Sequence, residues 1–158
     1  MEIANEKKIA GLVQFLRKGR TMTGRFRLPM SEEQAYEYLL AAYIMEVQLR
    51  YRRFIYNGFV EEKLKQVTNC LTANTAKFGI VLCGGCGNGK TTMLKALQNL
   101  VRRLEILKPN LSPNAGHSSD NYYSFTIVNA MQIVQILKTY YNKFCKLAKA
   151  DMLGIDDI

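Results

Sequence analysis

The feature that most constrains the fold is a glycine-rich run between an apolar segment and an amphipathic segment. The run, Gly84-Gly85-Cys86-Gly87-Asn88-Gly89-Lys90-Thr91-Thr92, fits the pattern G-x-x-x-x-G-K-[ST] at every fixed position. Residues 78–82 before it predict a short buried strand. The residues after it predict a helix, because apolar side chains recur there at helical spacing. These side chains are Met93, Leu97, Leu100, Val101 and Leu104. A strand, a glycine-rich turn and a helix in this order favour a phosphate-binding loop, or P-loop.

Each part of this run has a chemical role in such a loop. The glycines let the backbone curl so that successive N–H groups point at phosphate oxygens, and the helix N-terminus adds partial positive charge. Lys90 is expected to reach the β- and γ-phosphates, and the Thr91 hydroxyl to ligate Mg²⁺. The pattern therefore predicts binding of a nucleoside triphosphate with Mg²⁺, with an ordinary glycine-rich turn as the alternative. The predicted nucleotide-binding residues are Gly84, Gly85, Cys86, Gly87, Asn88, Gly89, Lys90, Thr91 and Thr92.

A second segment, residues 151–158, reads as a small apolar strand that ends in two acids, which is typical of a Walker B segment. Asp156 is predicted to hold the Mg²⁺ that bridges the phosphates, and Asp157 to polarise the attacking water. Acids also end strands as turn or cap residues, but their position after a P-loop favours the metal site. The predicted catalytic residues are thus Asp157 and Lys90, and the predicted metal ligands are Thr91 and Asp156.

The segment between the two motifs fits an α/β fold. Residues 109–121 are rich in Pro, Asn, Ser and Gly and predict a loop, and residues 122–128 predict a strand. Asn129 is a candidate N-cap for one helix with a single apolar face. That face consists of Ile133, Leu137, Tyr140, Tyr141 and Phe144. Strands that alternate with helices predict a parallel sheet with crossover helices.

Residues 124–130, the helix after them and residues 150–158 resemble the AAA+ ATPases of the DnaC/IstB group. These proteins are bacterial helicase loaders and transposition helper ATPases. The second threonine, Thr92, and a helix predicted over residues 60–71 match as well, so the resemblance covers about residues 55–158. It implies a P-loop AAA+ core that uses ATP and Mg²⁺. One departure is Asp157, where AAA+ proteins usually carry Glu.

The resemblance also implies binding partners, and it implies family elements that this sequence does not contain. The expected partners are ATP, single-stranded DNA and a replicative helicase, with homo-oligomerisation of the full-length protein. Family members continue past Walker B to further strands, a sensor residue and an arginine finger. We therefore expect residues 1–158 to be the N-terminal part of a longer protein, truncated after the Walker B strand. ATP hydrolysis is expected of the full-length protein and not of this chain alone.

Residues 1–54 predict a helical, basic N-terminal region ahead of a partial AAA+ domain at residues 55–158. Ile9, Leu12, Val13 and Leu16 share one helix face, and residues 17–27 carry five cations and no acid. Ser31 and Gln34 form a capping-box pattern that opens a second helix. Its apolar stripe, predicted to pack on the core, consists of Tyr36, Leu39, Leu40, Tyr43, Ile44 and Val47. Arg50, Arg52 and Arg53 follow it.

Charge and composition bear on the partner and the location. The net charge of +9 and the pI near 9.5 favour a polyanionic partner, with nucleic acid first and a solvated basic face as the alternative. No apolar run approaches the eighteen or so residues that span a membrane. The N-terminus begins with acids and lacks a signal-peptide pattern. We therefore expect a cytoplasmic protein without a membrane partner. Cys83 and Cys86 form a C-x-x-C pair, for which a metal or redox role is a minor alternative.

Three functions stay open at this point. The first is an ATP-hydrolysing accessory factor of DNA replication, a helicase loader, with a transposition helper ATPase as its near relative. The second is a nucleotide-dependent or purely adhesive adaptor without turnover. A small-molecule kinase is the third, and it is disfavoured because paired acids after the third predicted strand better suit water activation than phosphorylation of a metabolite.

Overall fold

The computed structural model describes residues 9–15, 26–73, 79–109 and 118–156, and these form an α/β structure. Residues 9–15 form a short helix in which every residue is exposed. The other elements are α2 (Glu32–Gln48), α3 (Gly58–Thr72), α4 (Lys90–Leu104), the 3₁₀ helix η1 (Ser119–Asn121), β1 (Phe125–Asn129), α5 (Ala130–Thr139), α6 (Tyr141–Ala148) and β2 (Met152–Asp156). None of the helices in these ranges combines the length and the apolar character needed to cross a membrane.

The sheet of the described residues consists of β1 and β2, which run parallel. Phe125 lies opposite Met152 at one end, and Asn129 lies opposite Asp156 at the other. Parallel strands need a long crossover connection, and α5 and α6 supply it. The prediction of a parallel sheet with a crossover helix is therefore confirmed for these two strands. β1 is shorter at its start than predicted, because Tyr122 forms an isolated antiparallel bridge with Leu107.

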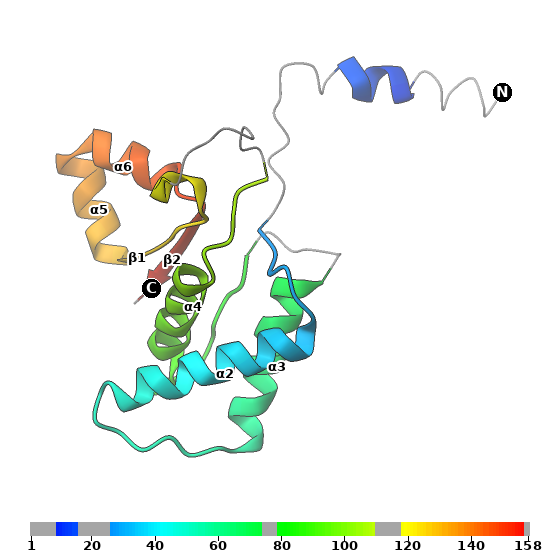
Figure 1. The fold of residues 1–158 in the computed structure, drawn as a ribbon. Helices are drawn as coiled ribbons and strands as arrows, with labels where there is room; N and C mark the ends of the chain where they lie inside the picture. Colours follow the sequence, from blue (N-terminus) through cyan, green and yellow to red (C-terminus); the bar gives the residue numbers. More distant parts are fainter. Residues whose placement is uncertain (1–8, 16–25, 74–78, 110–117, 157–158) are drawn as a thin grey trace.

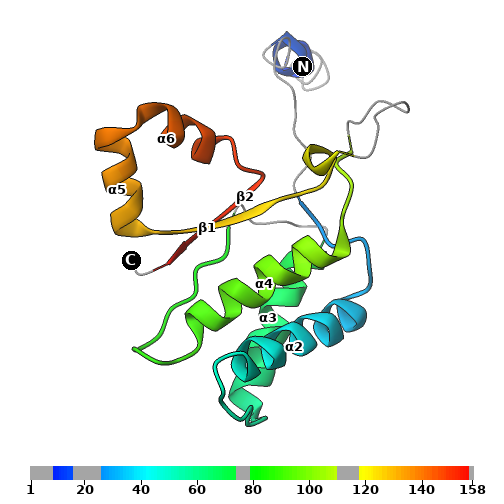
Figure 2. The same ribbon diagram turned by 60° about the vertical axis from the view of Figure 1, so that its left-hand side comes forward.

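Helix α4 lies between two layers. It packs on α2 on one side and on β1 on the other, and α2 in turn packs on α3 (Figures 1 and 2). The side chain of Gln98 in α4 also donates a hydrogen bond of 2.9 Å to the carbonyl oxygen of Phe125. The main buried apolar cluster joins the three helices and comprises Leu28, Ala35, Leu39, Tyr43, Leu64, Val67, Leu71, Met93, Ala96, Leu97 and Leu100. The predicted packing of the α2 stripe on the core is confirmed.

Local caps begin the helices where the sequence predicts them. Ser31 Oγ accepts a hydrogen bond from the backbone N–H of Gln34 at 3.2 Å, and the Gln34 side chain accepts one from Ser31 N at 3.3 Å. Asn129 and Gln132 form the same reciprocal arrangement at the start of α5. Such caps satisfy N–H groups that have no partner inside the helix. The predicted helix over residues 60–71 is confirmed as α3.

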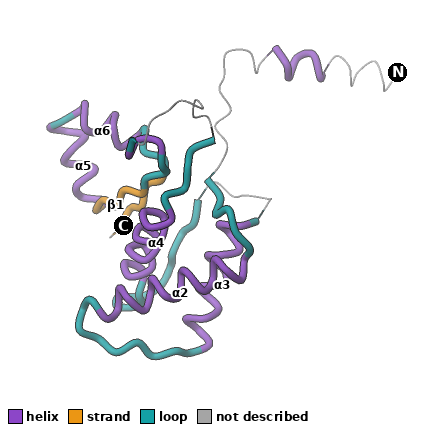
Figure 3. The backbone as a smooth tube through the Cα atoms, in the orientation of Figure 1, coloured by secondary structure: helices purple, strands orange, loops and turns teal. Residues whose placement is uncertain are grey.

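The strand predicted at residues 78–82 is not observed where the structure describes it. Phe78 lies outside the described residues, and residues 79–84 form neither helix nor strand (Figure 3). Ile80 and Leu82 pack against the core while Val81 is 82% exposed, so the burial alternates as in a strand. A strand also needs a neighbour that accepts its hydrogen bonds, and no described segment pairs with this one.

The single helix predicted after Asn129 is wrong, because the structure has two helices there. The helix breaks at Tyr140, whose φ of −138° and ψ of 69° are not helical, and α6 then starts in a new direction. Its apolar face is also largely open, since Leu137 is 46% and Tyr141 67% exposed. The principal contacts of α5 among the described residues are with α6 and β1, and Ile133 and Phe144 of the stripe are half-buried.

An ion pair joins the segment after α4 to the start of β2. Lys108 Nζ lies 2.9 Å from Asp151 Oδ2, and the backbone N–H and the hydroxyl of Ser124 donate to the same oxygen at 3.1 and 3.0 Å. Burial alone would raise the pKa of Asp151. The hydrogen bonds from Lys108 and Ser124 outweigh burial and hold the pKa below its usual range.

We predict that Asp151→Asn lowers the free energy of unfolding at pH 7 by about 1 kcal/mol, because the amide keeps one acceptor but loses the charge. A lowered folded-state pKa means that the Asp151 charge stabilises the fold above the unfolded-state pKa near 3.8. This stabilisation is lost as the pH falls through the folded-state value. Urea denaturation of both proteins between pH 7 and pH 2 measures the difference. A difference that does not shrink at the acid end contradicts this account.

Candidate functional site

The glycine-rich loop, residues 84–89, turns directly into α4. Gly87 and Gly89 have φ values of 80° and 79°, in the left-handed region that glycine adopts without strain. Gly89 is the N-cap of α4 and provides no side-chain cap. The first N–H groups of α4 therefore have no capping side chain from this residue, and a helix start of this kind can bind an anion.

Lys90, the first residue of α4, folds back over the loop. Its Nζ atom donates hydrogen bonds to the carbonyl oxygens of Gly84 at 2.7 Å and Gly85 at 2.8 Å. These bonds hold the ammonium group against the loop. A phosphate oxygen can replace either carbonyl, because an ammonium group donates to any acceptor in reach and a charged acceptor forms the stronger bond.

The two predicted metal ligands meet. Thr91 Oγ1 donates a hydrogen bond of 3.0 Å to Asp156 Oδ1, although 65 positions separate the two residues. Both are hard oxygen ligands, and Mg²⁺ is usually bound by one or two carboxylates together with phosphate oxygens and water. The pair therefore fits Mg²⁺. The described residues contain no group of three or more His, Cys, Asp or Glu side chains, and such a site does not need one. Asp157 lies outside the described residues.

Helix α2 and the turn after it place two side chains beside the loop and the start of α4. Arg50 Nη1 donates a hydrogen bond of 2.6 Å to Thr92 Oγ1, and the Tyr43 hydroxyl lies directly against Gly89. Burial raises the pKa of Tyr43, and the nearby charge of Arg50 offsets part of this effect. In the sequence, Arg50 stands in a basic segment with Arg52 and Arg53, and its contact with Thr92 is not predicted from it. Nothing in the sequence links Arg50 to a threonine 42 positions away.

The loop forms one wall of a cleft of about 480 Å³. Of the described residues that line it, two are arginines and none is acidic. Its other wall is apolar and comes from α2 and the start of α3. The lining residues are Tyr43, Val47, Arg50, Arg52, Phe59, Val60, Gly87, Asn88, Gly89 and Thr92. The cleft can thus accept an anion at the loop and an apolar group beside it.

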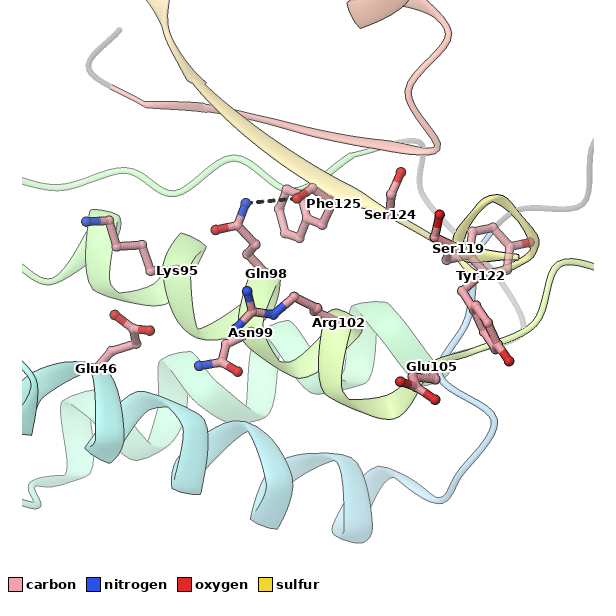
Figure 4. Close-up of a pocket in the computed structure, with 11 residues that line it drawn as sticks. Glu46, Lys95, Gln98, Asn99, Arg102, Glu105, Ser119, Tyr122, Ser124 and Phe125 are labelled. Carbon is pink, nitrogen blue, oxygen red and sulfur yellow. Dashed lines mark hydrogen bonds between the residues drawn. The ribbon is translucent and has the colours of Figure 1, made fainter. Parts of the chain in front are cut away.

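A second cleft, of about 560 Å³, lies between α4 and the approach to β1 (Figure 4). Its charged side chains are mixed in sign, with Glu46 and Glu105 beside Lys95 and Arg102. None of its lining residues belongs to the glycine-rich loop. The smaller cleft is therefore the candidate site, because it alone of the two contains residues of the motif.

Cys83 and Cys86, the C-x-x-C pair, are both exposed and are not joined by a disulfide. Cys86 sits within the loop and Cys83 just before it. The described residues place no further cysteine, histidine or acid beside them in a group of metal-binding size. The pair thus adds no ligand set to the site formed by Thr91 and Asp156.

Comparison with protein-family models, with curated proteins and with solved structures found no match to the chain in any of the three. The comparisons therefore leave the resemblance to the DnaC/IstB group untested. The chemistry of the site follows from the loop, the meeting of Thr91 with Asp156 and the cleft beside them.

A left-handed conformation costs a residue with a Cβ atom about 1–2 kcal/mol. We predict that Gly89→Ala lowers the free energy of unfolding by more than this amount. The added methyl group would also collide with the Tyr43 hydroxyl. The destabilisation beyond the cost of the left-handed conformation should disappear when Gly89→Ala is combined with Tyr43→Phe, which lacks the hydroxyl group. Urea denaturation of the single and double variants measures this coupling.

Gly87→Ala is the matched control, since Gly87 has nearly the same φ and open space where a Cβ would lie. Gly87→Ala should lower the free energy of unfolding only by the cost of the left-handed conformation. Equal destabilisation by Gly87→Ala and Gly89→Ala would mean that Tyr43 does not press on the loop.

Proposed function

We propose that this protein binds ATP together with Mg²⁺ at the glycine-rich loop. The observation that carries the proposal is the 3.0 Å hydrogen bond between Thr91 and Asp156, because it joins two motifs from distant parts of the sequence at one point. The loop supports it further, since Gly89 leads into α4 and Lys90 folds over the loop carbonyls. The cleft supports an anionic ligand, because its described lining residues include two arginines and no acid.

The residues of the site have distinct roles in this proposal. Backbone N–H groups of residues 84–92 bind the phosphate chain, and Lys90 exchanges its bonds to the loop carbonyls for bonds to the β- and γ-phosphates. Thr91 and Asp156 hold Mg²⁺, which neutralises charge on these phosphates when bound. The apolar wall of the cleft, including Val60 and Phe59, lies where a base or ribose can pack.

We further propose that the protein is an AAA+ ATPase of the DnaC/IstB group and acts as a helicase loader. The supporting features are the order of the motifs, the helix α3 before the loop, and the parallel pair β1 and β2 with Asp156 at the carboxyl end. Asp157 is the proposed water-polarising residue. A transposition helper ATPase and a nucleotide-dependent adaptor without turnover are the alternatives. Steady-state phosphate release by the full-length protein, measured with and without single-stranded DNA, separates an adaptor from an ATPase.

We predict that Lys90→Ala weakens ATP binding at least tenfold, since it removes a charge-assisted hydrogen bond to phosphate that is worth about 1.5–3 kcal/mol. Isothermal titration calorimetry in the presence of Mg²⁺ measures the change. Lys95→Ala is the matched control, because Lys95 lies on the same helix but lines the other cleft. Unchanged affinity in Lys90→Ala would rule out the loop as the phosphate site.

We predict that Asp156→Asn removes the gain in ATP affinity that Mg²⁺ gives, while it leaves binding in EDTA unchanged. The amide can still accept the hydrogen bond from Thr91, so the fold is kept, but it ligates Mg²⁺ more weakly than a carboxylate. Titrations of wild type and variant, each with Mg²⁺ and with EDTA, test this. An equal Mg²⁺ effect in both proteins places the ion elsewhere.

A further inference from the structure

Arg50 links the end of α2 to the first turn of α4, next to the glycine-rich loop. It lies in the turn that follows α2, where its backbone N–H donates to Val47 O at 3.2 Å. From there its guanidinium reaches α4 and donates from Nη1 to Thr92 Oγ1. The next residue, Tyr51, has a φ of 55°, so the chain reverses immediately after Arg50.

The second terminal nitrogen of Arg50 is unusual. Nη2 is fully buried and has no hydrogen-bond partner among the described residues, and it is the one buried side-chain nitrogen or oxygen of those residues in that state. Buried polar groups are nearly always hydrogen-bonded, and leaving one unpaired is costly, above all when it belongs to a charged group. A donor in this state therefore calls for an acceptor that the described residues do not supply.

The residues around Arg50 indicate the charge of the acceptor. Arg50 lines the 480 Å³ cleft together with Arg52 and the loop residues Gly87, Asn88 and Gly89. No acidic side chain is among the described residues that line this cleft, so no carboxylate neutralises the guanidinium there. The start of α4 adds partial positive charge beside it. An anion is the ligand for which these groups are arranged.

We propose that Arg50 binds the phosphate chain of the nucleotide, and that it does so from the turn after α2, outside the glycine-rich motif. The proposal rests on the function proposed above, because it takes the loop as the phosphate site. Thr92 holds Nη1 and so orients the planar group, which leaves Nη2 to donate to a phosphate oxygen. A guanidinium suits this task, since its donors lie in a fixed fork and its charge is permanent.

The alternative is that Arg50 only ties α2 to α4 through Thr92. Two substitutions separate the two roles. Arg50→Met removes the charge and keeps much of the apolar stem, and Arg50→Lys keeps the charge but lacks the fork. Arg53→Met is the matched control, because Arg53 is an exposed arginine of the same segment that does not line the cleft.

Calorimetry with ATP, tripolyphosphate and adenosine tests the proposal on the full 158-residue chain. We expect Arg50→Met to weaken ATP and tripolyphosphate binding about tenfold or more, to leave adenosine binding unchanged, and to be partly rescued by Arg50→Lys. Without any ligand, the melting temperature of Arg50→Met should equal or exceed that of wild type, because an unpaired buried donor is removed. Arg53→Met should match wild type in every titration.

Three results overturn the proposal. Unchanged ATP affinity in Arg50→Met, with affinity lost in Lys90→Ala, would leave the nucleotide site standing without Arg50. A lower melting temperature of the free Arg50→Met protein, with adenosine and tripolyphosphate weakened alike, would make Arg50 a structural tie. If wild type binds neither ATP nor tripolyphosphate, the nucleotide site itself fails and the role of Arg50 fails with it.

Discussion

The burial of one face of α4 is the constraint on which the rest of the described structure depends. This helix packs on α2 on one side and on β1 on the other. Its buried residues are Thr92, Met93, Ala96, Leu97, Leu100 and Val101. Burial of a side chain the size of Leu97, Leu100 or Val101 stabilises a fold by about 1.5–3 kcal/mol. Because Lys90 and Thr91 are the first residues of the same helix, the packing that stabilises the fold also places the site.

The parts of the fold that the sequence predicts well are those set by local contacts. The capping boxes at Ser31 and Asn129 involve residues three positions apart, so the pattern contains both partners. The glycine-rich loop is likewise local, because its turn depends on the left-handed conformations at Gly87 and Gly89. The meeting of Thr91 and Asp156 is long-range and was still predictable. The expected parallel sheet brings the carboxyl ends of its strands to one edge and so predicts the acid near the loop, although residues 79–84 before the loop form no strand.

The parts that the sequence does not predict depend on distant partners. Residues 79–82 have the alternation of a strand, but strand formation needs a neighbouring backbone that no pattern of side chains guarantees. The break at Tyr140 cannot be predicted from the sequence for a different reason. One non-helical residue hardly shifts the apolar spacing, so the stripe from Ile133 to Phe144 looks continuous in the sequence. The contact of Arg50 with Thr92 cannot be predicted from the sequence, because the packing of α2 on α4 brings the two residues together.

Placing Arg50 and Tyr43 at the loop changes how the N-terminal region relates to the site. Residues 1–54 look like a separate basic region in the sequence, yet α2 places the buried Tyr43 against Gly89, and Arg50 in the turn after α2 bonds Thr92. If the phosphates bind Arg50, any partner that moves α2 must first break that contact. Binding free energies are reciprocal, so the factor by which the nucleotide weakens such a partner equals the factor by which the partner weakens the nucleotide. Movement of α2 and binding of the nucleotide at the loop are then thermodynamically coupled.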